Sequence, residues 1–299
     1  MSHLARLSKH IQFPDNPLQA QRLFHGRGHA YQHLHHITID WLPPVLLIIL
    51  YAPEPHTELE NLADHLLAHL PDCKSIQLQH RYILSAPIDT LRGESLQNFP
   101  IQEDNLRFHI RLQQTRNTGL FLDMRNGRRW VQQHSKDKKV LNLFAYTCGF
   151  SVAAIAGQAQ SVLNIDMSRT ALSIGRENHR LNQQALEKVR FEKLNIFKSF
   201  SRLKKRGPFD VLICDPPTFQ KGSVDIFRDY PKIIRHLDDF MAENSTLLLC
   251  LNAPELNHNY LIDHMASQAP RFTYVEEIKP PDVFLETQNK GLKSLIFKR

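Results

Sequence analysis

An aspartate and two prolines, Asp215, Pro216 and Pro217, directly follow an apolar segment at residues 211–214. The apolar segment predicts a buried strand, and the prolines must end it because proline cannot continue a sheet ladder. Open α/β sheets bind their ligands at this carboxyl edge. A carboxylate fixed there could face a ring or exocyclic nitrogen, and Phe219 could stack on a base. The alternative interpretation is a rigid turn with a capping acid.

A second acid, Asp166, ends another predicted strand and lies 24 residues after Asn142. In nucleoside-binding folds, an acid at this point accepts hydrogen bonds from both hydroxyls of a ribose. The alternative role is that of a helix N-cap, because Asp166 and Ser168 precede a helical segment.

The loop that follows Asn142 contains a single glycine, Gly149, before the next helix begins. Such a turn brings backbone N–H groups and a helix N-terminus close to a ligand, and glycine permits a close approach. The loop lacks the GxGxxG pattern, so a pyrophosphate-binding dinucleotide site is poorly supported. The alternative is an ordinary turn between a strand and a helix.

Asn195 follows a third short strand, predicted at residues 189–192, and precedes Ile196 and Phe197. Its side-chain amide could read the edge of an adenine while the apolar pair covers the face of the ring. The alternative is an asparagine in an ordinary loop.

The elements that must position these residues alternate between strand and helix from about residue 117 onward. Apolar segments of strand length recur there, separated by segments with helical periodicity. This alternation predicts a mainly parallel, doubly wound α/β sheet. The predicted strands are residues 140–144, 161–166, 189–192, 209–214, 246–251, 274–276 and 294–297. The longer predicted helices are residues 169–183, 226–244 and 259–268.

The first hundred residues have a different pattern, with short strands around one amphipathic helix. The predicted strands are residues 37–41, 45–51, 75–78 and 82–84, and the helix covers residues 59–70. We therefore expect a lead-in over residues 1–20 and a small α+β domain over residues 21–100, which could contact an RNA substrate. The catalytic domain is expected over residues 101–299.

The net charge of +7 is unevenly distributed along the 299 residues. Residues 1–100 hold 7 Lys+Arg and 9 Asp+Glu, whereas residues 101–299 hold 30 and 21. A basic excess in the half with the strand-end residues suits a polyanion such as RNA. The alternative is charge that serves solubility alone. The candidate RNA-binding groups are Arg116, Arg125, Arg128, Arg129, Lys136, Lys138, Lys139, Arg202, Lys204, Lys205, Arg206 and Lys221.

Composition also excludes several classes of protein. No apolar segment is long enough to span a membrane, and the N-terminus lacks a secretory signal. The four cysteines lie far apart without CxxC spacing, which argues against a zinc site or a disulfide framework. We therefore expect a cytoplasmic protein without a metal or a membrane partner, and the sequence leaves the oligomeric state open.

Four segments together resemble class I S-adenosylmethionine-dependent methyltransferases: residues 118–125, 141–147, 162–169 and 215–219. The chain is most similar to bacterial large-subunit rRNA methyltransferases of the RlmK and RlmI type, and we expect the PUA domain of the RlmI type to be absent. The resemblance implies a Rossmann-like, seven-stranded sheet with a smaller N-terminal domain. It also implies S-adenosyl-L-methionine as cofactor and large-subunit rRNA as partner and substrate.

The resemblance assigns roles to residues by their position. It implies that Asp123 and Arg125 help to close the cofactor pocket. It also implies that four residues line the methionine part: Asn142, Phe144, Tyr146 and Gly149. At this loop, Cys148 stands where the family usually has a second glycine, so we expect its side chain to narrow the loop.

The same resemblance implies contacts to the nucleoside part of the cofactor and to the target. Asp166 would hold the ribose and Met167 would flank the adenine. Asn195, which replaces a usual aspartate, would meet the adenine edge together with Ile196. The target base would face the turn that begins at Asp215 and Pro216, and Asp215 is also expected among the cofactor-binding residues.

The cysteines bear on which atom is methylated. Methylation at C5 of cytosine needs a cysteine nucleophile. The RlmI type carries that cysteine after the strand matching residues 246–251, where this chain has Asn252, and Cys214 and Cys250 fall inside apolar segments as expected core thiols. Attack by a nitrogen needs only positioning, so we expect N-methylation. Guanine N7 is the first choice because the chain resembles the RlmK type most, and the resemblance implies that atom. The alternatives are a cytosine-C5 rRNA methyltransferase, a non-catalytic RNA-binding relative, and a protein or small-molecule N-methyltransferase.

Overall fold

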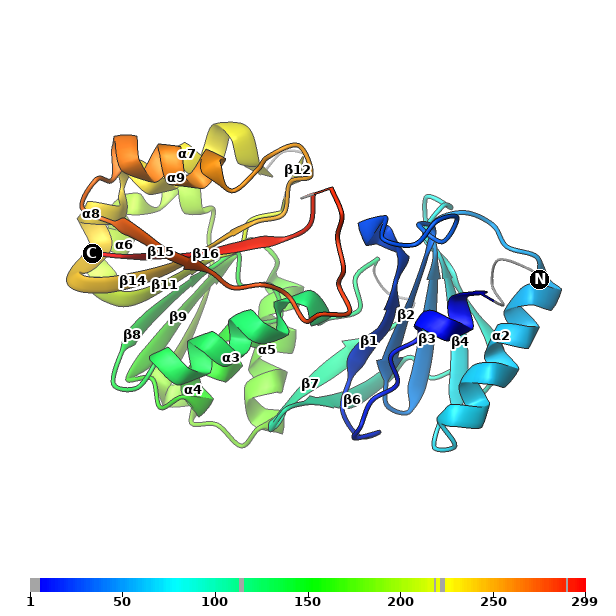
Figure 1. The fold of residues 1–299 in the computed structure, drawn as a ribbon. Helices are drawn as coiled ribbons and strands as arrows, with labels where there is room; N and C mark the ends of the chain where they lie inside the picture. The colour runs from blue at the N-terminus through cyan, green and yellow to red at the C-terminus, as the bar shows by residue number, and fades with distance from the viewer. Residues whose placement is uncertain (1–5, 113–115, 218, 221–223, 289) are drawn as a thin grey trace. The chain divides into compact units, whose positions relative to one another are not determined.

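The computed structural model describes residues 6–112, 116–217, 219–220, 224–288 and 290–299. The chain forms two compact units. The N-terminal unit comprises Met1–Asp123 and Pro281–Gln288, and the C-terminal unit comprises Met124–Pro280 and Asn289–Arg299. Figure 1 traces the elements of both. The structure thus divides the chain after Asp123 and not near residue 100.

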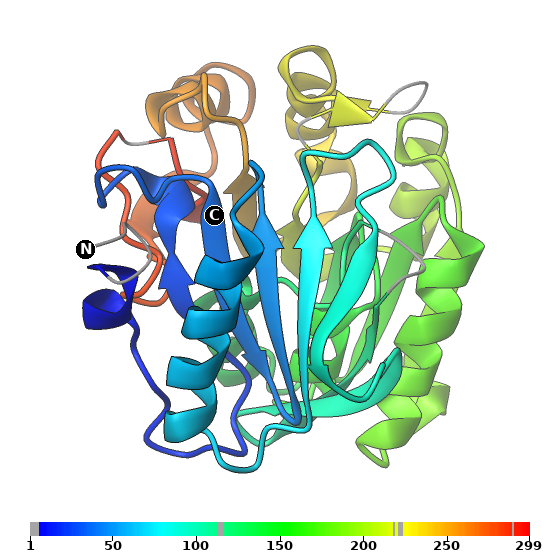
Figure 2. The same cartoon turned by 90° about the vertical axis from the view of Figure 1, so that its right-hand side faces the viewer.

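The N-terminal unit is built on a five-stranded sheet, with strand order β1-β2-β3-β4-β5. Strand β3 pairs parallel with β4, and the other pairs are antiparallel. One helix, α2 (His56–His69), covers a face of this sheet in Figure 2 and buries its leucines against it. The strands are β1 (Gln21–His25), β2 (Ile37–Leu42), β3 (Val45–Leu50), β4 (Ser75–His80) and β5 (Ile88–Gly93).

Two segments explain why this unit extends past residue 100. The hairpin of β6 (Asn98–Glu103) and β7 (Leu106–Arg111) joins it through a bridge between Gln19 and Gln102. The late segment 281–288 packs against Gly28, where a Cβ atom would lie 1.7 Å from the Leu285 carbonyl oxygen. Only glycine, which has no Cβ atom, allows the two backbone segments to lie this close. The contact explains why residue 28 is a glycine, which hydrophobic periodicity does not reveal.

One predicted strand of this unit is wrong. Residues 82–84 form a turn between β4 and β5, and Leu84 is 89% exposed. The apolar triplet is exposed because it lies in the turn that connects the two strands, so its apolar character alone does not indicate a strand.

The C-terminal unit contains a seven-stranded sheet with strand order β10-β9-β8-β11-β14-β16-β15. Strand β16 runs antiparallel to both of its neighbours, and the other pairs are parallel. The predicted fold class, a doubly wound α/β sheet, is confirmed. The strands are β8 (Lys139–Leu143), β9 (Ser161–Asp166), β10 (Val189–Lys193), β11 (Phe209–Cys214), β14 (Met241–Leu251), β15 (Thr273–Glu277) and β16 (Lys293–Lys298).

Helices cover both faces of this sheet (Figure 1). Alternate residues of one strand serve the two faces: Leu212 and Cys214 of β11 join one apolar core, whereas Val211 and Ile213 join the other. A strand buried on both faces is expected to be largely apolar, and β11 is apolar except for Asp210 near its amino end. The helices are α3 (Arg125–His134), α4 (Gly149–Ala156), α5 (Arg169–Leu181), α6 (Phe200–Arg206), α7 (Ile226–Arg235), α8 (Leu237–Phe240) and α9 (Asn259–Gln268).

The helix predicted over residues 226–244 is too long. It breaks after Arg235, and β14 already begins at Met241, which pairs with Phe209 of β11. The pairing with β11 outweighs the helical propensity of the Ala242–Glu243 segment, because tertiary contacts override weak local preference. Within the described residues, no helix is long and apolar enough to cross a membrane.

Candidate cofactor and catalytic site

The carboxylate of Asp166 joins the ends of two neighbouring strands. Its Oδ2 accepts a hydrogen bond from the Tyr146 N–H at 2.8 Å, and its Oδ1 accepts one from the Ser168 N–H at 2.7 Å. Each carboxylate oxygen can accept a second hydrogen bond, so both stay competent to bind hydroxyls. The side chain is half-buried, which leaves it accessible from the carboxyl edge of the sheet.

The N-cap of helix α5 is Ser168 and not Asp166. The Ser168 hydroxyl accepts a hydrogen bond from the Ala171 N–H at 3.2 Å, and its backbone is extended as a cap requires. The alternative role considered for Asp166 is therefore wrong. Its neighbour Met167 exposes 44% of its surface beside it.

The loop between β8 and α4 has an unusual backbone. Phe144, Tyr146 and Cys148 all have positive φ, at 57°, 47° and 62°. This left-handed conformation costs a non-glycine residue about 1–2 kcal/mol, and alternating it along a loop turns successive N–H groups toward one side, as in anion-binding nests. Strain of this kind persists where surrounding contacts over-determine it, often at functional sites. The single glycine seen in the sequence did not indicate it.

Cys148 does not narrow this loop as expected. Its thiol is fully buried and packs with Ala145 and Leu172. Opposite it, α5 carries Gly175, where a Cβ atom would lie 2.4 Å from the Cys148 sulfur. The side chain thus occupies space that glycine leaves on α5, away from the accessible side of the loop. Burial raises the pKa of the Cys148 thiol well above its ordinary value, so the group is neutral.

This packing predicts a coupled pair of substitutions. Gly175→Ala is expected to destabilise the protein by about 1–3 kcal/mol, because the new methyl group overlaps the Cys148 sulfur. Adding Cys148→Gly is expected to recover most of that loss. Urea denaturation of the single and double variants measures both.

The matched control is another helical glycine, Gly127 of α3, where a Cβ atom would meet its nearest neighbour at 3.4 Å. Gly127→Ala is expected to be neutral or to stabilise by up to about 1 kcal/mol. If Gly175→Ala behaved like the control, the account of Cys148 packing would be wrong.

Asn142 lies in the core and begins a chain of buried hydrogen bonds. Its Nδ2 donates to Asn164 Oδ1 at 2.8 Å, and Asn164 Nδ2 donates to the Ser151 hydroxyl at 2.9 Å. The Ser151 hydroxyl lies 2.9 Å from His179 Nε2, and His179 Nδ1 lies 2.6 Å from Gln184 Oε1. The Asn142 side chain therefore supports the strand end from within, and the sequence analysis missed its partners.

The direction of this chain follows from its last member. Gln184 Nε2 donates to the Val152 carbonyl, so Gln184 Oε1 must accept from His179 Nδ1. His179 Nε2 is then the acceptor for Ser151. Burial lowers the pKa of His179 to about 4, which keeps the imidazole neutral. A second tie, from Asn178 Nδ2 to the Thr147 carbonyl at 2.9 Å, holds the strained loop to α5.

Asn195 and Ile196 have different surroundings in the structure. Asn195 Oδ1 accepts a hydrogen bond from the Phe197 N–H at 3.0 Å. This bond fixes the orientation of the side-chain amide and leaves its Nδ2 group as a donor for a ligand. Ile196 is buried in the core and does not cover a ligand face. The half-buried ring of Phe197 instead lies 6.3 Å from that of Phe144 at the end of β8. Of the apolar pair, only Phe197 is thus partly accessible, and its covering of the adenine stays a prediction.

The turn after β11 leaves the sheet where predicted. Asp215 is half-buried, Pro216 is buried and Pro217 is exposed. Thr218 and the side chain of Phe219 lie outside the described residues, so stacking by Phe219 stays a prediction. Strand β12 (Phe219–Gln220) then pairs with β13 (Val224–Asp225) and leads into α7.

The two cysteines nearest this turn are both in the core. Cys214 and Cys250 are fully buried, and burial raises the pKa of Cys214 above its ordinary value. Asn252, which follows β14, is exposed instead. Neither core thiol is placed as an accessible nucleophile.

A comparison with known protein families decides the identity of the chain. A family model described as S-adenosylmethionine-dependent methyltransferase matches residues 21–298. The chain belongs to this family. The cofactor inferred from the sequence is thus that of the family, and the matched range includes most of both units.

Individual relatives agree with this assignment. Ribosomal RNA large subunit methyltransferase I of Tolumonas auensis is 38% identical over 128 residues, which cover 42% of this chain and 32% of the relative. That of Shigella boydii serotype 18 is 30% identical over 241 residues, covering 77% and 60%. The chain thus spans at most three-fifths of either relative's length. A solved S-adenosylmethionine-dependent methyltransferase from Streptococcus mutans shares the fold, with 22% identity and a TM-score of 0.87 over 100% of this chain and 82% of that one.

Two residues assigned to the cofactor pocket fall in different units of the methyltransferase. Asp123 ends the N-terminal unit, and Arg125 begins α3 of the C-terminal unit. Their role in closing the pocket stays a prediction.

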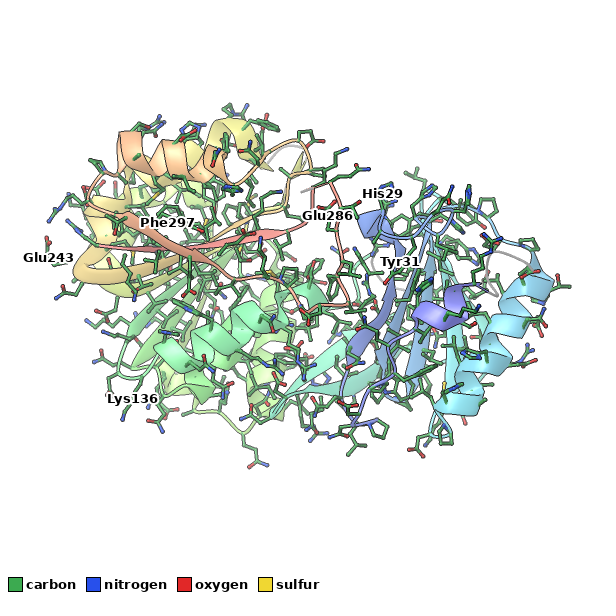
Figure 3. All side chains as sticks on the ribbon, viewed as in Figure 1. His29, Tyr31, Lys136, Glu243, Glu286 and Phe297 are labelled. Atoms are coloured by element: carbon green, nitrogen blue, oxygen red, sulfur yellow. The ribbon has the colours of Figure 1, made fainter. Side chains whose placement is uncertain are left out.

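Three lysines of the methyltransferase lie far from the carboxyl ends of the strands. Lys136, labelled in Figure 3, and Lys138 precede β8, and Lys139 is its first residue, so all three lie at the amino edge of the sheet, opposite Asp166. They are poorly placed to contact a base at the carboxyl edge. Arg202 and Arg206 form ion pairs with Glu192, near the carboxyl end of β10, and Lys204 pairs with Asp239.

Proposed function

We propose that this methyltransferase transfers a methyl group to a base of large-subunit rRNA, with a ring nitrogen as target and guanine N7 favoured. The observation that carries the proposal is the Asp166 carboxylate, held by two backbone N–H groups beside the strained loop. Asp215 flanks the same loop from the other side, since β8 lies between β9 and β11. Two strand spacings, roughly 10 Å, separate the two acids.

The residues present fit S-adenosylmethionine. Asp166 would accept the two ribose hydroxyls while it keeps its bonds to Tyr146 and Ser168. Asn195 Nδ2 would donate to a ring nitrogen of the adenine, with Met167 and Phe197 against its faces. The methionine part would lie against the loop of Phe144, Tyr146 and Gly149. When bound, the cofactor supplies a methyl group on a sulfonium, which is a strong electrophile.

Transfer to guanine N7 requires no protein nucleophile. The N7 lone pair forms the new bond to the methyl carbon, the bond from that carbon to sulfur breaks, and S-adenosylhomocysteine leaves. No proton is lost, so the guanine gains a positive charge. The Asp215 carboxylate would stabilise this charge, since a fixed group of opposite sign acts most strongly where charge develops. Attack at cytosine C5 would need a thiolate, whereas both neighbouring thiols are buried.

Two further observations support RNA as the partner. The curated relatives carry ribosomal RNA methyltransferase in their names. The C-terminal two-thirds of the chain also hold the basic excess, 30 Lys+Arg against 21 Asp+Glu. A ribosomal substrate implies that the protein works in the cytoplasm.

The test uses the purified protein, isotopically labelled S-adenosylmethionine and large-subunit rRNA from cells that lack the gene. We expect labelled 7-methylguanosine after nuclease digestion and mass spectrometry. Labelled 5-methylcytidine would overturn the choice of atom. Absence of transfer to rRNA, together with transfer to a protein or small molecule, would overturn the substrate class.

A further inference from the structure

A buried tyrosine joins the ends of the two strands beside the proposed target site. Tyr230 of α7 is 1% exposed, and its hydroxyl lies 3.2 Å from the Cys214 carbonyl and 3.1 Å from the Cys250 carbonyl. Cys214 ends β11, and Cys250 is the penultimate residue of β14. A phenol has one proton, so the two carbonyls share it.

The Cys214 carbonyl directly precedes Asp215, which the proposed reaction uses. The Cys250 carbonyl lies two residues before Asn252, the first residue after β14. The next two residues after Asp215 are prolines, which have no N–H to fix the turn by a backbone hydrogen bond. The hydroxyl of Tyr230 therefore links the ends of β11 and β14 by hydrogen bonds at the point where the turn after β11 begins.

Tyr260 of the neighbouring helix α9 is a second tyrosine whose hydroxyl lies between two carbonyl oxygens. The Tyr260 hydroxyl of α9 lies 3.3 Å from the Ile226 carbonyl and 3.1 Å from the Phe227 carbonyl. Pro231 lacks the N–H that would bond Phe227 within α7, and Tyr260 supplies the missing donor. Tyr260 therefore stabilises the first turn of α7, and its hydroxyl does not bond the carbonyls of Cys214 and Cys250.

We propose that Tyr230 is a positioning residue for methyl transfer, which holds the ends of β11 and β14 together and so sets the place of Asp215. This rests on the function proposed above. Tyr230 touches neither the base nor the cofactor. Its contribution is to the alignment of the target, because a shift of about 1 Å at a reacting group can cost on the order of 100-fold in rate.

Burial supports this role at all relevant pH values. The apolar surroundings of Tyr230 raise the pKa of its hydroxyl well above the ordinary value, so the group remains a donor. Its ring packs in the core with Ile233 and Leu249. Tyr230→Phe would keep that packing and remove only the shared proton.

The test compares Tyr230→Phe with Tyr260→Phe on the full chain. For Tyr230→Phe we expect kcat for methyl transfer to fall about 10- to 100-fold. The Kd for S-adenosylhomocysteine should stay within about threefold, because the residues expected to hold its ribose, adenine and amino-acid part follow β8, β9 and β10. For Tyr260→Phe we expect a similar loss of stability in urea denaturation and a kcat within about twofold of the wild type. Equal losses of kcat in both variants, or an unchanged kcat in Tyr230→Phe, would overturn the proposal.

A second measurement does not depend on activity. Amide hydrogen exchange in peptides covering residues 209–215 and 247–253 is expected to rise in Tyr230→Phe and not in Tyr260→Phe. Unchanged exchange at both strand ends would overturn the positioning role even if the wild type methylated no RNA. An inactive wild type with the expected exchange difference would instead refute the proposed function alone.

Discussion

Replacing Asp166 with alanine is expected to weaken the binding of S-adenosylmethionine on the order of 100-fold or more. Two ribose hydroxyls lose a charged acceptor, and a hydrogen bond to a charged group is worth about 1.5–3 kcal/mol. The Tyr146 and Ser168 N–H groups also lose their acceptor, which removes a restraint on the strained loop. Isothermal titration calorimetry with S-adenosylhomocysteine measures the effect.

The control for this prediction is Ser168→Ala. It keeps the backbone N–H that donates to Asp166 and removes only the cap hydroxyl of α5. We expect it to lower stability by about 1 kcal/mol and to leave cofactor affinity within about threefold. Equal cofactor affinity in Asp166→Ala and the wild type would show that the ribose binds elsewhere.

Replacing Asp215 with asparagine is expected to lower kcat for methyl transfer by roughly 100-fold, because removal of one group aimed at developing charge typically costs about 3–4 kcal/mol. Cofactor affinity should change by less than about threefold, since the residues expected to hold the ribose, the adenine and the methionine part follow other strands. Single-turnover transfer of a labelled methyl group to rRNA gives the rate, and calorimetry gives the affinity.

The matched control is another aspartate of the same strand. Asp210 stands near the amino end of β11, where its Oδ2 accepts a hydrogen bond from the Lys139 N–H at 2.8 Å. Asp210→Asn is expected to leave kcat within about twofold, because it lies at the opposite edge of the sheet. If Asp215→Asn raised the Kd for the cofactor as much as it lowered kcat, Asp215 would be a cofactor ligand and not a group that faces the base.

Much of the C-terminal unit could be predicted from local patterns. Strands β9 and β11 begin and end at the predicted residues, because apolar segments buried on both faces are short, continuous and bounded by polar residues. Asp166 and Asp215 were found for the same reason, since an acid at the end of an apolar segment is visible within a few residues. The helix predicted to residue 244 failed where β14 competes for the same segment.

The local geometry of the site was less visible. Three left-handed residues shape the loop after β8, although Phe144, Tyr146 and Cys148 are types that rarely adopt positive φ. Ile196 was predicted at a ligand face and lies in the core, because a 3-10 turn after Asn195 rotates Phe197 outward in its place. Such a rotation depends on a cap hydrogen bond and not on hydrophobic pattern.

The sequence by itself determined the alternation of strand and helix, the acids at the strand ends and the absence of a cysteine after the prolines. Hydrophobic periodicity and the residues that end a strand, such as proline, are local features of the sequence. They specify which residues reach the carboxyl edge of a parallel sheet. Only the tertiary structure decided that Cys148 fits against Gly175, that Asn142 belongs to a buried chain ending at Gln184, and that Tyr230 joins Cys214 to Cys250. These contacts join residues on different elements, so no local pattern in the sequence could reveal them.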